Sequence, residues 1–455
     1  MNITRCTIGR NRVRVNKTRE TFVSNFGLLM TMIGVAVGLG AVWRFPYMVG
    51  KFGGAAFVLF YMVVILFIGI PALIAEWSLG RYSRRGTLGA YEKGGFPGGK
   101  YAGAFLFFIV FWACGYYSNA VGWVGFHAIG ALLSGFGVKL NTSAILPPAE
   151  GFNSTSFLLQ LMMTGVVIST CAIVLLKGLR KGIEKVSKWI VPALFCILII
   201  LIIRSVTLQN AGEGIRWYIG EFRFNELAPS VMAAALGMAF FSMSLGGTFM
   251  VIYGSYLDAD ANIPKNAIFT GIGASTAGIL AGFAIFPAVF AFNLEPASGP
   301  GLIFSTLPKT FAMMPFGWIF ALLFFAGLFG AAYLSDVAAF EVLVGGFLDN
   351  SNMSRKKAVL LCCSIVFVLA IPPMINYKIF IPWDLLFGSG MQVLGSLFAV
   401  ITVGWCIKKS IILEEMKRGS TSRIHKILFW WLRIIIPLAI LGVGINWLIE
   451  SVFSK

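Results

Sequence analysis

The chain has 455 residues, of which 58% are hydrophobic and only 12% are charged, and its mean hydropathy is +0.86. This apolar content exceeds what the core of a soluble protein needs, so composition excludes an ordinary soluble domain. The formal net charge of +18 does not by itself indicate nucleic acid as a partner, because the cations gather in particular connections between apolar runs.

Runs of about 20 apolar residues recur along the whole chain, and each can cross a hydrocarbon layer roughly 30 Å thick. Strands of a membrane β-barrel would be shorter and would alternate apolar with polar residues, and these runs do not. The pattern therefore predicts an all-α integral membrane protein with eleven transmembrane helices. The predicted spans are 24–47, 54–79, 101–134, 156–176, 187–206, 229–256, 265–292, 315–347, 357–375, 383–407 and 427–450.

Basic clusters occupy alternate connections, which is typical of cytoplasmic loops. This places the N-terminus in the cytoplasm and, with an odd number of spans, the C-terminus outside. We expect a cytoplasmic N-terminal arm at 1–20 and one transmembrane domain at 21–455, with no partner nucleic acid. A basic arm that binds nucleic acid or lipid headgroups stays an alternative for 1–19. The clusters are Arg10, Arg12, Arg14, Lys17 and Arg19; Arg81, Arg84 and Arg85; Lys177, Arg180, Lys181 and Lys185; Arg355, Lys356 and Lys357; and Lys408, Lys409, Lys417 and Arg418.

The chain carries no motif of a familiar enzyme class. It has no HExxH, nucleophile elbow, phosphate loop or cysteine–histidine cluster, and most of its seven cysteines fall inside predicted spans without metal or redox spacing. We therefore expect no enzymatic activity.

Two spans contain helix-weakening residues at corresponding positions. The first holds Gly38 and Gly40, and the sixth holds Gly246 and Gly247, in "FFSMSLGGTF" (Phe240–Phe249). Unwinding a helix in hydrocarbon strands polar backbone groups unless they face protein, water or a ligand. Interruptions in both halves indicate an inverted-repeat transporter, with helices 1–5 (about 21–206) against helices 6–10 (about 229–407) and a peripheral helix at 427–450. Glycines that only permit close helix packing are the alternative.

Freed N–H groups at a broken helix attract an anion, and freed carbonyls attract an ammonium or a metal cation. A zwitterion near the midplane would use both.

Four stretches together resemble the neurotransmitter:sodium symporters, a family that includes the bacterial leucine transporter. They are "VGLGAVWRFPYMVGKFGGAAFVLFY" (Val37–Tyr61), "GIPALIAEWSLGRYS" (Gly69–Ser83), "IFPAVFAF" (Ile285–Phe292) and "GPGLIFSTLP" (Gly299–Pro308). The similarity extends from about Arg19 to Trp405, and eleven spans are typical of a prokaryotic amino-acid member. It implies unwound helices 1 and 6 around the substrate.

The resemblance implies a role for residues around those breaks. The N–H groups of Leu39 and Gly40 and the Tyr117 hydroxyl would hold a substrate carboxylate, and four further residues would hold its ammonium. Monoamine carriers have an aspartate where this chain has Gly38, so we expect an amino acid as substrate. The four ammonium-binding residues are Ala36, Phe241, Ser242 and Ser244.

The resemblance also implies two gates. Arg44 and Asp384 would close the outer side, with Tyr117 and Phe241 as an inner lid, and Arg19 and Asp349 would close the cytoplasmic side. Glu76, an intramembrane carboxylate, is either a structural anchor near the break in helix 6 or a proton site.

The family's first sodium site is not intact. Relatives supply side-chain oxygens where this chain has Ala41 and Ala274, and only Ser242 keeps its hydroxyl. Because sodium is a hard cation that needs several oxygens, we expect this site to be absent or very weak.

The second sodium site would use the carbonyls of three residues and the hydroxyl of Ser335, with Leu334 where another ligand should be. Asp336 follows directly, and an unpaired buried carboxylate is costly. Three interpretations stay open: Asp336 replaces the lost sodium ligand, it carries a proton because desolvation disfavours its charged form, or it satisfies a neighbouring hydroxyl. Coupling is then to one Na⁺, to H⁺, or to nothing. The three carbonyls belong to Gly34, Val37 and Ala331.

Four positions that would line the substrate side chain hold mostly small residues: Ala113, Gly247, Ser335 and Ala339. We therefore expect a bulky hydrophobic L-amino acid, unless Met243, Thr248 or Tyr333 fills the space. The predicted function is secondary transport in the cytoplasmic membrane by a monomer or weak dimer. A sodium-independent or proton-coupled carrier and a non-transporting amino-acid sensor are the alternatives.

Overall fold

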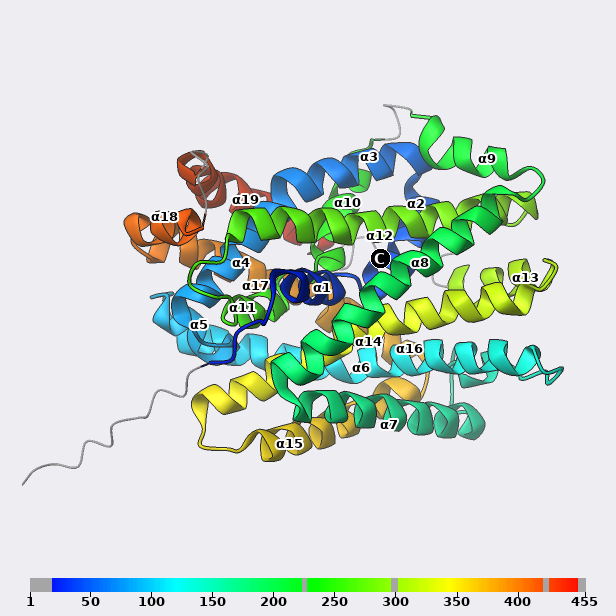
Figure 1. Ribbon diagram of the computed structural model, residues 1–455, viewed down its shortest axis with the longest axis horizontal. Coiled ribbons are helices and arrows are strands. Elements are labelled where there is room, and N and C mark those ends of the chain that lie inside the picture. Colours follow the sequence, from blue (N-terminus) through cyan, green and yellow to red (C-terminus); the bar gives the residue numbers. More distant parts are fainter. Residues whose placement is uncertain (1–18, 223–226, 296–301, 420–424, 449–455) are drawn as a thin grey trace, which may run out of the picture.

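The computed structural model describes residues 19–222, 227–295, 302–419 and 425–448, and every regular element in these ranges is helical (Figure 1). Most of the N-terminal arm expected at 1–20 lies outside them. The helices of the first half are α1 (Asn25–Ala36), η1 (Gly40–Arg44), α2 (Phe45–Phe52), α3 (Gly54–Val64), η2 (Ile65–Gly69), α4 (Ile70–Ser83), α5 (Thr87–Lys93), α6 (Gly99–Ser134), η3 (Thr142–Ile145), α7 (Ser154–Leu176), η4 (Leu179–Glu184), α8 (Lys185–Val206), α9 (Ala211–Ile215) and η5 (Arg216–Gly220).

The second half contains the broken α10–α11 pair and the long helices α12 and α14. Its elements are α10 (Pro229–Ser242), α11 (Phe249–Gly254), α12 (Ile263–Ala291), η7 (Leu302–Thr306), α13 (Leu307–Ala312), α14 (Gly317–Asn350), α15 (Arg355–Leu369), η8 (Pro372–Met374), α16 (Tyr377–Trp383), η9 (Asp384–Gly390), α17 (Gln392–Ile401), η10 (Thr402–Cys406), α18 (Lys409–Lys417) and α19 (His425–Leu448).

Nine helical stretches within the described ranges are long and apolar enough to span a membrane, and the bent pair formed by α1 and η1–α2 makes a tenth. The remaining expected span corresponds to α10 and α11, each of which is too short on its own. The all-helical membrane fold predicted from the apolar runs is thus the fold of the chain.

Several helices begin at a side-chain cap, which supplies an acceptor to one of the unpaired N–H groups of the first turn. Ser24 accepts from the N–H of Gly27 at the start of α1, and Asn153 and Asn262 cap α7 and α12 in the same way. The polar residue just before an apolar run thus marks where the helix starts.

Both predicted helix breaks are present. Between the α1 half (Asn25–Ala36) and the half at Gly40–Phe52 the axis bends by 53°. Between α10 and α11 the chain is non-helical, with left-handed φ values at Ser244 (51°), Gly246 (83°) and Thr248 (62°). Left-handed backbone cannot continue a right-handed helix, so the second break is a non-helical segment of several residues rather than a kink at a single residue.

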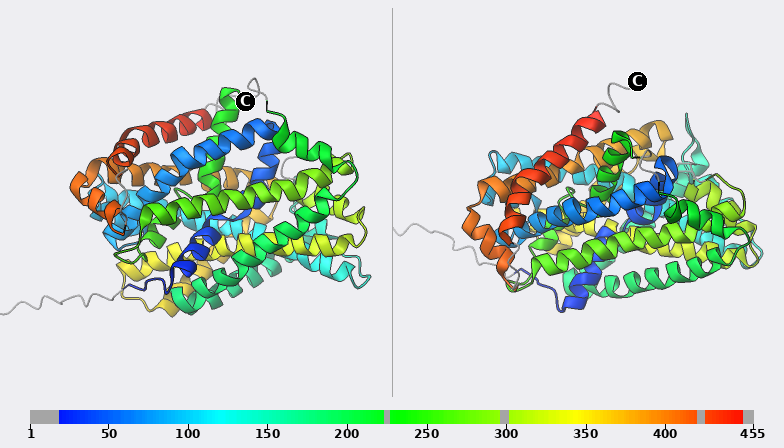
Figure 2. Two further views of the ribbon diagram at one scale, coloured as in Figure 1. Left: turned by 45° about the horizontal axis from the view of Figure 1, so that its top comes forward. Right: turned by 90° about the horizontal axis from the view of Figure 1, so that it is seen from above.

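The two breaks meet inside the bundle. In Figure 1, α1 is seen nearly end-on at the centre, and it packs against α8, α12 and α14, while α6 and α14 run side by side. The peripheral helix α19 lies at the edge of the bundle, against α17 and α10, as the views in Figure 2 show. The interrupted segments are therefore enclosed by intact helices, which is the setting in which unwound backbone is tolerated in a membrane.

Candidate functional site

A cavity with about 530 Å³ of empty space lies where the two interrupted helices meet. Its walls come from the α1 break, from α6, from the α10–α11 segment, from α14 and from the start of α17. The lining residues are Ala36, Gly38, Gly40, Ala113, Cys114, Tyr116, Tyr117, Phe241, Ser244, Phe249, Ser335, Ala339 and Gln392. Most of the residues expected at the substrate are therefore brought together, although Leu39, Ser242 and Gly247 are not among those that line this cavity.

The α1 break is tied to its neighbours by three hydroxyl groups. The hydroxyl of Tyr117 on α6 accepts the N–H of Leu39 at 3.1 Å, so the two groups expected at a substrate carboxylate are adjacent. The carbonyl of Val35 accepts from the hydroxyls of Ser244, at 2.8 Å, and Ser335, at 3.1 Å. The unwound segment is thus held from α6, α14 and the second break together.

The carbonyls expected at a substrate ammonium are partly used within the chain. The Ala36 oxygen accepts the N–H of Gly38 at 3.1 Å, and the Phe241 oxygen accepts the N–H of Ser244 at 3.1 Å. Each carbonyl oxygen has two lone pairs, so the Ala36 oxygen keeps capacity for one further donor, whereas the Phe241 oxygen also accepts the N–H of Met243 and is fully used.

Gly38 leaves no room for a side chain. A Cβ at this position would lie 2.5 Å from the Ser335 Oγ and 2.7 Å from the Tyr117 hydroxyl oxygen. An aspartate there, as in monoamine carriers, would collide with both hydroxyls. The small residue is thus a requirement of this packing as well as a difference in charge.

A second cavity, with about 470 Å³ of empty space, lies next to the first. Both are lined by Tyr116, Tyr117 and Phe241, so these rings separate the two spaces. Arg44 and Asp384, the expected outer gate, both line the second cavity, and the guanidinium carbon of Arg44 stands 4.5 Å from the Phe241 ring centroid. Arg44 of the expected outer gate therefore lies against Phe241 of the expected inner lid.

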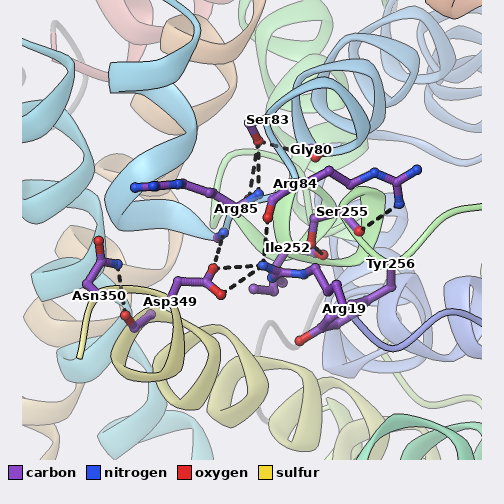
Figure 3. Close-up of polar contacts among 12 residues, drawn as sticks. Arg19, Gly80, Ser83, Arg84, Arg85, Ile252, Ser255, Tyr256, Asp349 and Asn350 are labelled. Atoms are coloured by element: carbon purple, nitrogen blue, oxygen red, sulfur yellow. Dashed lines mark hydrogen bonds and ion pairs between the residues drawn. The ribbon is translucent and has the colours of Figure 1, made fainter. Parts of the chain in front are cut away.

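The other expected gate pair is an ion pair in the structure. A guanidinium nitrogen of Arg19 lies 2.8 Å from Asp349, and the same nitrogen donates to the carbonyl of Arg84 at 3.0 Å (Figure 3). Asp349 also accepts the N–H of Gly86 at 2.6 Å, and the Arg19 guanidinium lies over the ring of Tyr256 at 4.8 Å. These contacts join the segment before α1 to α14 and to the connection after α4.

Comparison with known proteins assigns the family. The model of the sodium:neurotransmitter symporter family matches residues 19–141 and 149–454. The chain belongs to this family. An uncharacterized sodium-dependent transporter of Haemophilus influenzae is 33% identical, with 95% of this chain and 98% of the relative covered, and another from Bacillus subtilis is 32% identical, with 93% and 97% covered. The crystal structure of MhsT in complex with L-phenylalanine matches with a TM-score of 0.82 and 33% identity, over 94% of this chain and 99% of MhsT.

At the symporter family's first sodium position, this chain supplies few oxygens. Ala41 and Ala274 are fully buried and carry only methyl groups. The Ser242 hydroxyl lies 2.8 Å from the hydroxyl of Tyr61 and donates to the Ala239 carbonyl at 3.2 Å. Two of the three side chains at this position therefore offer no oxygen to a cation, and the third, the Ser242 hydroxyl, already makes two hydrogen bonds within the protein.

At the second sodium position, the side chain of Leu334 packs against the α1 backbone. A Cβ at Gly34 would lie 2.7 Å from the Leu334 Cδ1, so an alkyl group occupies the place where another ligand was expected. Ser335 keeps its hydroxyl beside α1, through its bond to Val35. In the described part of the chain, no three His, Cys, Asp or Glu side chains converge as a metal site.

Asp336 lies against helices other than α1. Its two carboxylate oxygens accept from the Ser118 hydroxyl at 3.1 and 2.9 Å, and the thiols of Cys114 and Cys171 lie 3.6 and 3.9 Å away. Adjacent residues on a helix point about 100° apart, so Asp336 and Ser335 serve different neighbours. Of the three interpretations, these contacts favour the one in which Asp336 satisfies a hydroxyl.

Glu76 holds the second break. It is fully buried in α4, and its Oε1 accepts the N–H of Gly246 at 2.9 Å, within the α10–α11 connection. This contact is the one expected of a structural anchor.

Sequence reasoning missed four residues of the cavity: Cys114, Tyr116, Phe249 and Gln392. Phe249 is the first residue of α11, and its ring occupies space beside Gly247 that a side chain at 247 would otherwise fill. The signal available in the sequence was Phe249 two residues after Gly247. The direction in which the Phe249 ring points, however, depends on the backbone conformation of the α10–α11 connection.

Proposed function

We propose that this chain carries a bulky hydrophobic L-amino acid across the cytoplasmic membrane by alternating access. The observation that supports this proposal is the cavity between two interrupted helices, whose lining combines backbone and hydroxyl groups at the α1 break with aromatic rings and small apolar side chains. Such a combination suits a zwitterion that bears an apolar side chain.

The position of each end of the solute follows from the contacts. Its carboxylate would receive the N–H groups of Leu39 and Gly40 and the hydroxyl of Tyr117. Its ammonium would donate to the spare lone pair of the Ala36 carbonyl and to the Ser244 hydroxyl oxygen, both of which line the cavity. The similar chain MhsT was crystallised with L-phenylalanine, which supports an aromatic or large aliphatic side chain here.

The transport cycle would use the two gates in turn. With the N-terminus in the cytoplasm, the Arg19–Asp349 pair closes the cytoplasmic side, and Phe241 with Arg44 above it forms the barrier toward the outer cavity. Entry from outside would require Phe241 to move aside, and release inside would require the Arg19 ion pair to break. All these groups lie in one chain, so a monomer suffices, and the repeats at 21–206 and 229–407 would rock against each other.

Coupling would differ from that of relatives with two sodium sites. We propose that the first sodium site is lost, since two of its side chains are methyl groups and the third is bonded internally. A single sodium ion would then bind at the second position, through the carbonyls of Gly34, Val37 and Ala331 and the Ser335 hydroxyl. The sodium-dependent transporters among the relatives support use of sodium.

A sodium-independent or proton-coupled carrier is the second candidate. It is favoured by the alkyl side chain of Leu334 at a position where another oxygen was expected. With so few oxygens, the second site would bind sodium weakly.

Proteoliposomes separate these functions. Uptake of labelled L-phenylalanine is measured under a sodium gradient alone, a proton gradient alone, and neither. We expect saturable uptake driven by sodium with one ion per substrate. A stoichiometry of two sodium ions would overturn the lost-site proposal, uptake driven only by protons would support the second candidate, and binding without counterflow would identify a sensor.

A further inference from the structure

Phe249 and Gly247 compete for the same space at the apolar end of the substrate cavity. A Cβ built on Gly247 would lie 2.0 Å from Cε2 of the Phe249 ring. Phe249 is 9% exposed and lines the cavity, whereas Gly247 does not. The ring therefore forms a wall that a side chain at position 247 would otherwise provide.

Apart from the rings of Tyr116, Tyr117 and Phe241, which separate this cavity from the second one, its other apolar walls are made of small side chains. Ala113 and Cys114 come from α6, and Ala339 comes from α14. Since these residues contribute little volume, the distance available to a substrate side chain depends mainly on where the Phe249 ring stands.

The direction of Phe249 is fixed by the residue before it. Thr248 adopts a left-handed backbone conformation with φ of 62°, which is unfavourable for a β-branched residue. Its hydroxyl lies 2.8 Å from that of Thr87, and both side chains are fully buried or nearly so. Thr87 begins α5, which packs against α11. Thr87 therefore lies outside the cavity but holds the Thr248 backbone that orients the Phe249 ring.

We propose that Phe249 determines which substrate side chains this cavity accepts, and that Thr87 is a positioning residue for it. This inference rests on the proposed function. It states that the position of the Phe249 ring decides which hydrophobic amino acids bind. Removing the ring lengthens the apolar end, and adding a side chain at 247 pushes the ring into the cavity.

The test is equilibrium binding of L-alanine, L-leucine, L-phenylalanine and L-tryptophan to the full chain in detergent. Phe249→Ala should raise the affinity for tryptophan relative to leucine by about 10-fold or more, since even one methylene in a hydrophobic pocket discriminates by roughly 10- to 200-fold. Gly247→Ala should move the same ratio the other way, and the Gly247→Ala, Phe249→Ala double variant should recover binding of large side chains. Phe249→Leu gives a milder form of the change if the alanine variant folds poorly. Phe269→Ala, at a ring 50% exposed on α12, is the control.

Thr87→Val removes the hydroxyl but keeps the shape of the side chain. It should shift the tryptophan-to-leucine ratio of affinities, and Thr87→Ser should restore it; a purely structural role would lower the melting temperature without changing the ratio. Equal ratios in the parent and in both the Phe249 and Gly247 variants would overturn the inference. Failure of the parent chain to bind any of the four amino acids would instead overturn the proposed function.

Discussion

Replacing Tyr117 with phenylalanine removes one oxygen from the substrate cavity and leaves the ring in place. In the structure this oxygen accepts the Leu39 N–H at 3.1 Å, and it keeps its own proton to donate to a carboxylate. A hydrogen bond to a charged group contributes about 1.5–3 kcal/mol. At about 1.4 kcal/mol for each factor of ten, we expect L-phenylalanine to bind about 10- to 150-fold more weakly.

The variant also leaves the N–H of Leu39 without its hydroxyl partner, which costs about 1–3 kcal/mol if no water replaces it. Binding is therefore measured by isothermal titration at a temperature where a thermal scan shows the variant folded. Tyr101→Phe, on the same helix α6 but 79% exposed, controls for loss of a phenol elsewhere.

A substrate without a carboxylate sharpens this test. L-Phenylalaninol keeps the ammonium and the ring, so the Tyr117→Phe change should affect its affinity much less than that of L-phenylalanine. Equal affinity of the parent and the variant for L-phenylalanine would refute the reasoning, because the hydroxyl would then make no contact that matters for the carboxylate.

Three further predictions concern the supports of the cavity. Glu76→Ala should lower the melting temperature and Glu76→Gln should retain most of it, because the amide keeps an acceptor for the backbone N–H at the α10–α11 break; equal melting temperatures for both variants and the parent would contradict the anchor. Gly38→Ala should abolish detectable binding of L-phenylalanine, since its Cβ would lie 2.5 Å from a hydroxyl oxygen, whereas Gly442→Ala, which meets no atom within 4 Å, should bind normally; unchanged binding by the first variant would show that the cavity tolerates a methyl group. Arg19→Ala should speed labelling of an introduced Ser255→Cys by about 5-fold, the factor that corresponds to about 1 kcal/mol for a partly exposed ion pair, and an unchanged rate would argue against a gate at this pair.

The helix breaks could be predicted because they depend on local sequence. Glycines within an apolar run indicate weakened helix, and α1 and α10 indeed stop at Ala36 and Ser242, close to those glycines. The conformation inside the second break could not be predicted, because two of its three left-handed residues, Ser244 and Thr248, are not glycine. Their conformations are supported by contacts with distant residues, which single-sequence reasoning does not see.

The side chains around the cavity also divide into those whose place could be predicted from sequence and those whose place could not. Tyr117 was placed beside Leu39 by the resemblance, and the structure brings the two together. Phe249 was missed because its direction is set by Thr248 and, through it, by Thr87. Asp336 was grouped with Ser335 because they are adjacent in sequence, although helical geometry turns neighbours by about 100° and so sends them to different partners.

The Val35 carbonyl has consequences for the order of events during binding. Its two lone pairs are both engaged, by the hydroxyls of Ser244 and Ser335, so it has no vacancy for a third donor or for a cation. Anything positively charged that reaches this oxygen must first rotate one serine away, and the released hydroxyl then becomes an acceptor for the newcomer. A cation that binds the Val35 oxygen would therefore replace one serine, and α1 would lose one of the two hydroxyl contacts that it makes through this carbonyl.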